Sequence, residues 1–405
     1  MKAGPLSGFR VLDLSRILAG PWASQLLADL GAEVIKIERP GQGDDTRGWG
    51  PPYMPDESGA PTSESAYFHS ANRGKQSVCI DISSKPGQKL IIQLVAKCDV
   101  LIENFKVGGL KKYGLDYASL KAINPNLVYC SITGFGQTGP YRERAGYDFM
   151  IQAMGGLMSV TGEQEGEPMK VGVALSDVMT GLYAANAIQA ALIHRLRGGE
   201  GQHIDLALLD VQVATLANQS MNYLASGSNP QRLGNAHPNI VPYQAFQTAD
   251  GYLILAVGND TQFARFCDLA GRPELADDER FETNRNRVKN RDVLIPYLIE
   301  IMLTQSTDTW LEQLNQQGIP CGPIASIDQV FDNPQVQHRG MLLELDHPTA
   351  GKVPSVANPI RLSESAVIYD KAPPLLGQHT EQVLSDLLAL DKKRIGELKT
   401  AGTIG

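Results

Sequence analysis

One aspartate, Asp177, has the residue type and setting best suited to covalent chemistry in this chain of 405 residues. The apolar residues before it, 169–175, predict a buried strand, and the small residues from Thr180 to about His194 predict a helix. A carboxylate at a strand-to-helix junction lies at the carboxyl edge of a sheet, where open α/β folds bind ligands. If this carboxylate is a nucleophile, the protein is an acyl-transfer enzyme.

The alternative role for Asp177 is structural. Ser176 and Asp177 are both favourable N-cap residues, and a negative charge in a first helical turn suits the helix dipole. Catalysis and capping are compatible, because a helix N-terminus would help to keep the carboxylate ionised. The predicted helix is also rich in small residues, which allow close backbone approach: Gly181, Ala184, Ala185, Ala187, Ala190 and Ala191.

Basic residues follow several predicted strands and could recognise an anionic ligand. Arg39 follows the second strand, at the place where an arginine suits a ribose phosphate, and coenzyme A carries a 3′-phosphate on its ADP moiety. Lys75, Lys106 and Lys112, the last beside Lys111, lie near other strand ends. Each residue alone is consistent with a solvated charge, but their repetition in an acidic chain favours an anionic cofactor.

A parallel sheet is needed to bring these side chains together. Strands alternate with helices through the first third of the chain, which indicates an α/β fold with a large, Rossmann-like open parallel sheet. An ordinary NAD site is disfavoured, because Ala19-Gly20-Pro21 stands in place of the Gly-x-Gly-x-x-Gly fingerprint. The predicted strands are 11–15, 33–38, 77–82, 100–103, 127–133 and 201–207.

The length of the chain suits two or three folding units. Residues 1–224 predict the N-terminal part of a large α/β domain, and residues 225–335 predict a smaller α+β domain. Within the latter, residues 244–257 predict two antiparallel strands around the turn Thr248-Ala-Asp-Gly251. Residues 336–405 are expected to form an extended C-terminal strap.

Composition argues against several classes of protein. The net charge of −8 argues against nucleic acid as the main partner, and no apolar run is long enough to predict a membrane span. The five cysteines are scattered without a Cys-x-x-Cys pair, so structural thiols and no metal site are expected. The N-terminus has no signal-peptide pattern, which favours the cytoplasm, or the mitochondrial matrix for a eukaryotic protein whose presequence is absent.

Several motifs together resemble the class III coenzyme A transferases, the family of formyl-CoA transferase and the CaiB/BaiF proteins. The similarity covers essentially the whole length. Its motifs are Leu12-Asp-Leu-Ser-Arg16 with Ala19-Gly-Pro21, Gly31 to Arg39, Gly43-Asp-Asp-Thr-Arg47 with Trp49, Glu103-Asn-Phe105, Ser131-Ile-Thr-Gly-Phe-Gly136, and Gly172 to Gly181. Within the family, segments 44–52, 129–140, 234–246 and 373–379 most resemble the branch that exchanges CoA between succinyl-CoA and glutarate.

The resemblance implies an assembly, a reaction and a set of contacts. It implies an interlocked, ring-like homodimer whose large domain includes the strap, with coenzyme A as a substrate and no permanently bound cofactor. It makes Asp177 the nucleophile that passes CoA from a short acyl-CoA, such as succinyl-CoA, to a free acid such as glutarate through covalent aspartyl intermediates. The expected cofactor contacts are Arg16, Leu18, Ala19, Arg39, Asn72, Lys75, Asn104, Phe105, Lys106, Lys112 and Tyr147.

Two residues are candidates for contact with the acyl group. Arg47 could bind the distal carboxylate of a dicarboxylic acid, since its fork of donors fits a carboxylate. It is equally suited to an internal salt bridge with Asp44 or Asp45. Trp49 could form a wall of the acyl pocket, although plain packing explains a tryptophan equally well.

Asp148 and His237 complete the substrate candidates. A histidine in a polar loop is more often a surface residue than a catalyst, and this alternative applies to His237. The glycine-rich lid of the formyl-CoA branch is missing, and residues 234–238 are the segment that could replace it. The identity of the acid pair is not fixed by these residues.

Two other functions compete with CoA transfer. An α-methylacyl-CoA racemase shares the fold but needs an acid/base group on each face of the α-carbon, and its pattern has a histidine in Gly-His-Asp. Here the segment is Gly146-Tyr147-Asp148, and tyrosine is a poor base near neutral pH. A non-catalytic CoA-binding protein is the second alternative, which the intact motif around Asp177 disfavours.

Overall fold

The computed structural model of the chain describes residues 3–405, and these form two compact units. The first unit contains the chain up to Leu157 together with Val171–Ser220 and Pro334–Gly405. The second unit contains Met158–Lys170 and Met221–Asn333. The C-terminal residues therefore return to the unit that the N-terminal residues build.

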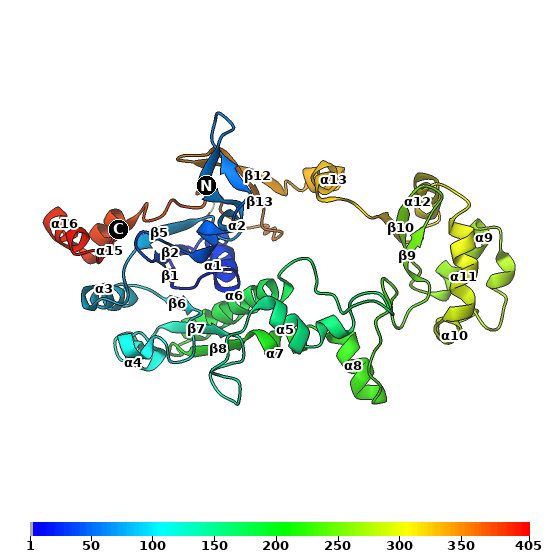
Figure 1. The fold of residues 1–405 in the computed structure, drawn as a ribbon, viewed down its shortest axis with the longest axis horizontal. Helices are drawn as coiled ribbons and strands as arrows, with labels where there is room; N and C mark the ends of the chain where they lie inside the picture. Colours follow the sequence, from blue (N-terminus) through cyan, green and yellow to red (C-terminus); the bar gives the residue numbers. More distant parts are fainter. Residues whose placement is uncertain (1–2) are drawn as a thin grey trace. The chain divides into compact units, whose positions relative to one another are not determined.

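A six-stranded sheet organises the first unit (Figure 1). All neighbouring strands are parallel, in the order β5-β2-β1-β6-β7-β8, so the chain has the α/β fold that its alternation of strands and helices predicts. The carboxyl ends of parallel strands share one edge, which gathers the residues after each strand. The strands are β1 (Arg10–Asp13), β2 (Glu33–Glu38), β5 (Lys75–Cys79), β6 (Val100–Glu103), β7 (Val128–Thr133) and β8 (His203–Ala207).

Helices cover both faces of this sheet and enclose two apolar cores (Figure 1). Side chains alternate along each strand, so Val11 and Val34 enter one core while Leu12 and Ile35 enter the other. The first core lies under α1 and α6, and the second under α3, α4, α15 and α16. Their bounds are α1 (Ala19–Asp29), α6 (Leu175–Leu196), α3 (Lys85–Val95), α4 (Tyr117–Lys121), α15 (Thr380–Leu388) and α16 (Lys392–Thr400).

The small residues of α6 allow it to approach α1 closely. A Cβ atom at Gly181 would lie 2.8 Å from the carbonyl oxygen of Ala19 and 3.0 Å from the side chain of Trp22. Any larger residue at position 181 would therefore push the two helices apart. The contact holds the first turn of α6, which carries Asp177, beside the start of α1.

The segment before Asp177 differs from the sequence prediction. Residues 169–175 form no strand: the place beside β7 is taken by β8, and the backbone N–H of Val171 donates to Oε1 of Gln152 at 2.9 Å. The helix α6 begins at Leu175, earlier than the predicted start at Thr180. Asp177 thus lies in a first helical turn and not at a strand-to-helix junction.

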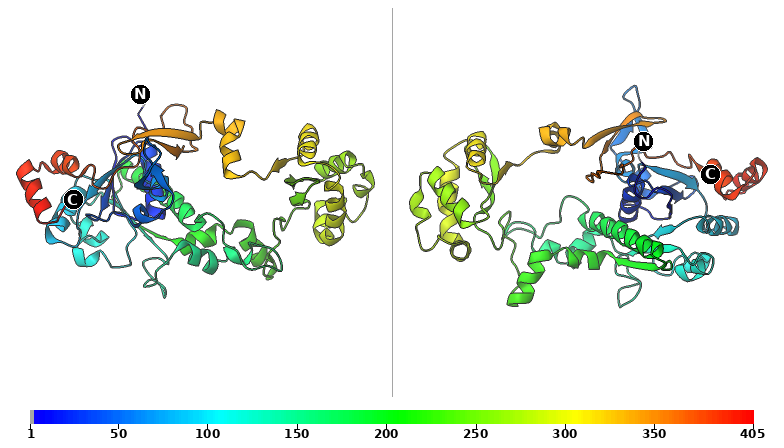
Figure 2. Two further views of the ribbon diagram at one scale, coloured as in Figure 1. Left: turned by 45° about the horizontal axis from the view of Figure 1, so that its top comes forward. Right: turned by 180° about the vertical axis from the view of Figure 1, so that it is seen from behind.

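The C-terminal segment runs along β5 and completes the first unit (Figure 2). The backbone N–H of His379 donates to the carbonyl oxygen of Ser77 at 2.9 Å, and Ile404 forms an isolated antiparallel bridge with Ile80. A hairpin of this segment packs against α2. The C-terminal segment contains α14 (Pro334–His338) and the hairpin of β12 (Leu342–His347) and β13 (Gly351–Val356). The N-terminal part contributes α2 (Ala66–Ser70) and a separate hairpin of β3 (Tyr53–Pro55) and β4 (Pro61–Ser65).

The second unit is built on a three-stranded antiparallel sheet, β11-β10-β9. The hairpin β9–β10 turns at Thr248–Gly251, as its sequence predicts, and Phe246, Phe263 and Trp310 fill the core beside it. No helix of residues 3–405 is both long and apolar enough to cross a bilayer. The bounds are β9 (Tyr243–Gln247), β10 (Tyr252–Ala256), β11 (Cys321–Pro323), α9 (Asp260–Leu269), α10 (Asn284–Lys289), α11 (Arg291–Met302), α12 (Thr307–Gln316) and α13 (Ile327–Asp332).

The long helix predicted after β8 is divided in two. α7 (Leu208–Ala214) and α8 (Ala217–Ser226) are separated where Ala217 takes a left-handed conformation with φ of 46°. A left-handed residue cannot continue a right-handed helix, so the chain changes direction there. The middle segment of the first unit ends at Ser220, within α8.

Candidate active site

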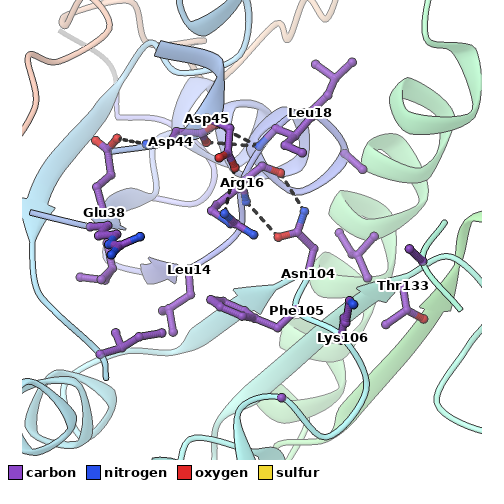
Figure 3. A pocket seen from close by; sticks show the side chains of 18 of the residues that line it. Leu14, Arg16, Leu18, Glu38, Asp44, Asp45, Asn104, Phe105, Lys106 and Thr133 are labelled. Atoms are coloured by element: carbon purple, nitrogen blue, oxygen red, sulfur yellow. Dashed lines mark hydrogen bonds and ion pairs between the residues drawn. The ribbon is translucent and has the colours of Figure 1, made fainter. Parts of the chain in front are cut away.

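A pocket of about 910 Å³ lies at the carboxyl edge of the sheet, within the first unit (Figure 3). Segments that follow all six strands contribute to its wall, among them Leu18, Arg39, Ile80, Asn104, Gly134 and Leu208. The first turn of α6 adds Asp177. The volume suits a ligand of cofactor size.

Asp177 lies in the first turn of α6, whose backbone N–H groups are capped by a side chain from another helix. The N-cap position of α6 is Ala174, which has no side-chain cap to offer. The carboxylate of Asp148, at the start of α5 (Asp148–Met154), accepts the N–H groups of Ser176 at 2.8 Å and of Asp177 at 3.3 Å. Among the residues described, the Asp177 carboxylate itself has no hydrogen-bond or ion-pair partner. Its oxygens are therefore available to a ligand.

The surroundings of Asp177 disfavour its charge. Burial, and next the negative charge of Asp148, raise the pKa of Asp177 from 3.8 to about 7. A carboxylate that is poorly solvated and lacks a counter-ion is a better nucleophile than one in water. Because only the ionised form can attack, chemistry at Asp177 should increase as the pH rises through about 7.

The turn between β1 and α1 forms a second part of the wall. Ile17 has φ of 73°, a left-handed conformation that costs a non-glycine residue on the order of 1–3 kcal/mol. The buried carboxylate of Asp44 accepts the N–H of Ile17 at 3.2 Å and pairs with Lys36 at 2.9 Å. The side-chain amide of Asn104 bonds the N–H of Arg16 at 2.9 Å and its carbonyl oxygen at 2.7 Å (Figure 3). The turn is therefore fixed from both sides.

The cations at this edge differ in their partners. Arg16 pairs with Asp45 at 2.8 Å, and its guanidinium lies 5.8 Å from the ring centroid of Phe105. Arg39 donates to the neutral side chain of Gln42 at 3.1 Å. Lining residues that make no ion pair within the described part of the chain are Arg39, Lys106, Lys112 and Arg144. The pocket thus retains positive charge for an anionic ligand.

Two expected cofactor contacts, Asn72 and Lys75, do not line the pocket. Both are fully buried, and the Nζ of Lys75 bonds Asp13 at 3.3 Å, Oδ1 of Asn72 at 2.9 Å and the carbonyl oxygen of Pro21 at 2.9 Å. Burial lowers the pKa of Lys75 to about 7, against the attraction of Asp13. Lys75 begins β5, whereas Ile80–Ser83, after that strand, reach the pocket. This corrects the expectation of a direct contact.

The other expected cofactor contacts all line the pocket. Tyr147, which stands where a racemase would have a histidine, is among them with an exposed side chain. The set is Arg16, Leu18, Ala19, Arg39, Asn104, Phe105, Lys106, Lys112 and Tyr147.

Arg47 does not line the pocket and is engaged inside the protein. It makes a bidentate ion pair with Glu38, with both N–O distances at 2.8 Å, and its guanidinium lies 3.7 Å from the ring centroid of Phe68. The internal salt bridge exists, but its partner is Glu38 and not Asp44 or Asp45. The expected role of Arg47 with a distal substrate carboxylate finds no support in this geometry.

The remaining substrate candidates are dispersed. Trp49 lies outside the pocket wall, is 46% exposed, and contacts the ring of Tyr67 edge-on at 5.1 Å. His237 belongs to the second unit, where its ring lies 5.3 Å from that of Tyr243. Only Asp148 has a direct connection to Asp177, through the backbone N–H bond described above.

Several parts of the wall were not predicted from the sequence, among them Gly402 of the C-terminal segment. Ile80–Ser83 were missed because the predicted strand extended to Ile82, whereas β5 ends at Cys79 and leaves these residues in the loop that lines the pocket. Arg142 and Arg144 lie in the loop after β7, and the signal that identified Arg39, a cation after a strand, would also have found them. Leu208, at the start of α7, carries no recognisable signal.

A buried cluster of Glu64, His69 and His347 offers possible metal ligands within 4.8 Å of one another. Nε2 of His69 lies 3.5 Å from Oε2 of Glu64, and neither ring nitrogen of His69 has a hydrogen-bond partner. Two features disfavour a cation there. Nδ1 of His347 accepts the N–H of Ala350 at 3.2 Å, which leaves the ring proton on Nε2, and Arg47 lies 3.7 Å from Glu64. These contacts make the cluster a poor cation site, and it is better explained as polar packing among β4, α2 and β12.

Comparisons with known proteins cover both units. The model of CoA-transferase family III matches residues 6–380. A succinate–glutarate CoA-transferase of Agrobacterium fabrum is 53% identical over 395 residues, which cover 96% of this chain and 97% of the relative. A human succinyl-CoA:glutarate CoA-transferase is 46% identical over 400 residues, covering 99% of this chain and 90% of the relative.

A solved structure agrees with these matches. A CaiB/BaiF family protein from Brucella suis shares 53% sequence identity and has a TM-score of 0.84, covering 96% of this chain and 100% of that chain. Similarity at this level of identity extends to family membership as well as to the fold.

Proposed function

The chain belongs to CoA-transferase family III, and from this membership and the setting of Asp177 we propose that it transfers coenzyme A from succinyl-CoA to glutarate through covalent intermediates on Asp177. The observation that carries the proposal is the unpartnered carboxylate of Asp177 in a cofactor-sized pocket. The acid pair comes from the names of relatives that are 53% and 46% identical.

In the first half-reaction the donor acid is released. The Asp177 carboxylate attacks the thioester carbonyl of succinyl-CoA, the C–S bond breaks, and CoA leaves as a thiolate. The product on the protein is a mixed anhydride of aspartate and succinate. The thiolate then attacks the aspartyl carbonyl, which forms an aspartyl-CoA thioester and frees succinate.

The second half-reaction mirrors the first. The glutarate carboxylate attacks the aspartyl thioester and displaces CoA thiolate, which leaves an aspartyl-glutaryl anhydride. The thiolate then attacks the glutaryl carbonyl, releases glutaryl-CoA and restores the Asp177 carboxylate. The thioester bond energy is conserved throughout, and no water is consumed, so a closed pocket protects both anhydrides from hydrolysis.

Backbone N–H groups at the start of α1 suit the oxyanions of these steps. Leu18 and Ala19 line the pocket, and α1 begins there without a side-chain cap. The N-terminus of a helix carries a partial positive charge and unpaired N–H donors. Donors that are fixed before the reaction stabilise a developing oxyanion strongly.

Trapping the intermediate tests the role of Asp177. Hydroxylamine added with succinyl-CoA should convert the peptide that contains Asp177 into a hydroxamate that mass spectrometry detects. The variant Asp177→Ala should show no adduct and should lose about 10³-fold or more of the exchange rate, because the reaction has no other nucleophile. CoA binding by calorimetry serves as its folding control. Near-normal exchange by this variant would disprove the mechanism.

The acid pair needs a separate experiment. Purified protein with succinyl-CoA is offered a panel of free acids that includes glutarate, oxalate and 3-hydroxy-3-methylglutarate, and products are identified by mass. Glutaryl-CoA should form fastest. A different preferred acceptor would reject the assigned pair while leaving CoA transfer intact, and deuterium uptake at the α-carbon of a chiral acyl-CoA would instead favour racemase chemistry.

We also propose that two copies of the chain associate. Helices α5 and α6 expose large apolar side chains, a feature that marks contact surfaces in soluble proteins. These side chains are Phe149, Met150, Met154, Leu182, Tyr183, Ile193 and Leu196. A second copy is the partner that the family resemblance implies.

A further inference from the structure

An arginine without an ion pair lines the same pocket as Asp177, and we propose that Arg144 binds the distal carboxylate of the dicarboxylic acyl group. This inference rests on the proposed function, because it gives a partner to the second carboxylate of a succinyl or glutaryl group. That carboxylate does not react, yet it must enter the pocket with its charge. A charge that leaves water needs a counter-ion at its new position.

The chain path brings Arg144 toward Asp177. Arg144 lies in the loop that follows β7 and runs directly into Asp148, whose carboxylate holds the backbone N–H of Asp177 at 3.3 Å. The base of this loop is closed by a tight backbone contact, because a Cβ atom at Gly134 would lie 2.5 Å from the Cα of Gly146. Arg144 and Asp177 both line the same pocket.

The nucleotide part of coenzyme A has a different set of cations. Arg39 follows β2, and the strands β1 and β6 separate β2 from β7 in the sheet. Three strand spacings of about 4.8 Å place the ends of β2 and β7 roughly 14 Å apart. Arg39 is therefore suited to the ribose phosphate, and Arg144, on the loop that follows β7, is left for a different part of the ligand.

Arg144 is available where neighbouring arginines are not. Its guanidinium makes no ion pair with any residue between 3 and 405. Three other arginines of this region are already paired: Arg16 with Asp45, Arg47 with Glu38, and Arg142 with Glu143. The free guanidinium thus takes the role that the sequence suggested for Arg47.

Aromatic packing prepares Arg144 for a carboxylate. Its guanidinium lies 4.0 Å from the ring centroid of Tyr141, and Tyr141 contacts Phe135 edge-on at 5.6 Å. Stacking restrains the plane of the guanidinium and leaves its N–H edge free for a bidentate contact. A lysine would keep the charge but would lose both the stacking and the fork.

The experiment compares acyl groups that differ only in the distal carboxylate. Succinyl-CoA is compared with butyryl-CoA as donor, and glutarate with pentanoate as acceptor, in the wild type, Arg144→Ala and Arg144→Lys. The alanine variant should lose about 10- to 100-fold in kcat/KM for the dicarboxylic substrates, as expected for a lost charged hydrogen bond, and little for the monocarboxylic ones. The lysine variant should lie between the two.

Two results would overturn the assignment: an equal loss with succinyl-CoA and butyryl-CoA, which would indicate a contact with coenzyme A, or no loss with either. Binding of free CoA to Arg144→Ala should match the wild type by calorimetry. The control Lys121→Ala removes an exposed cation of α4 outside the pocket and should leave the preference unchanged. If another acid pair proves correct, the preference for dicarboxylic over monocarboxylic substrates tests Arg144 independently.

Discussion

Single residues of the site differ in whether their charges have partners. Beneath the pocket, Lys36 and Asp44 have no exposed side-chain surface and pair at 2.9 Å, an arrangement in which a buried charge is tolerated. Asp177 has no counter-ion, and the charge that acts on it, Asp148, has the same sign. The fold therefore keeps an unfavourable interaction at the one carboxylate whose reactivity gains from it.

The pH dependence of exchange follows from this interaction. A raised pKa means that the Asp177 carboxyl is protonated below about pH 7, so kcat/KM should rise with pH through that value. The variant Asp148→Asn keeps an oxygen that accepts the N–H of Ser176 but removes the negative charge. In initial-rate measurements between pH 5 and 9, the rise of kcat/KM with pH should therefore occur at lower pH in this variant than in the wild type. An unchanged pH dependence in a folded variant would show that Asp148 does not influence ionisation at Asp177.

The sequence predicted pocket residues correctly when the strand before them was assigned correctly. Arg39 and Asn104 directly follow β2 and β6, so their place at the carboxyl edge could be derived from the apolar strand pattern. Lys75 was misjudged because it begins β5 and pairs inward with Asp13. The predicted strand, 77–82, already placed Lys75 at its amino end, so the strand pattern itself argued against a position at the carboxyl edge.

At the scale of elements, two connections give the pocket its shape. In the turn from β1 to α1, the carboxylate of Asp44 accepts the N–H of the left-handed residue Ile17, and the amide of Asn104 bonds the backbone of Arg16. The start of α6 is held by Asp148 from α5. In both cases a side chain from another segment fixes backbone N–H groups, in the turn that precedes α1 and in the first turn of α6.

Variants of the Lys36–Asp44 pair can separate the effect of Asp44 on the free energy of unfolding from its effect on CoA binding. Asp44→Ala should cost about 3–5 kcal/mol in the free energy of unfolding, because it leaves the Lys36 charge buried and unpaired. Adding Lys36→Met removes that charge and should recover most of the loss. CoA affinity should stay low in the double variant, because the N–H of Ile17 still lacks its acceptor. Urea unfolding and calorimetry measure the two quantities; restored CoA affinity would contradict this role of Asp44.

Element predictions failed where apolar residues serve a purpose other than sheet formation. The apolar residues within 169–175 predicted a buried strand, but the structure leaves Val173 exposed in an irregular segment. A short apolar run shows that side chains avoid water; it does not show which element covers them. The parallel sheet was predictable because its apolar runs are continuous and each is followed by a helix.

At the scale of the whole molecule, distant parts of the chain complete the first unit. Residues of α15 and α16 fill the second core, and Gly402 reaches the pocket wall beside Ile80. The sequence indicated this return only through the family resemblance, because an extended, proline-rich segment has no periodicity that reveals where it packs. The same segment also meets α2 through the contact between His347 and His69.

Association of two copies is the prediction that involves the whole molecule. The wild type should have twice the mass of one chain in light scattering after gel filtration, because the apolar faces of α5 and α6 are otherwise left in water. Ile193→Glu should raise the dissociation constant by placing a charge on this surface, and activity should then fall on dilution. Lys393→Glu, an exposed change on α16, should leave the mass unchanged. A wild type that is monomeric and active at all concentrations would exclude the dimer, because the exposed helix faces would then need no partner for the site to function.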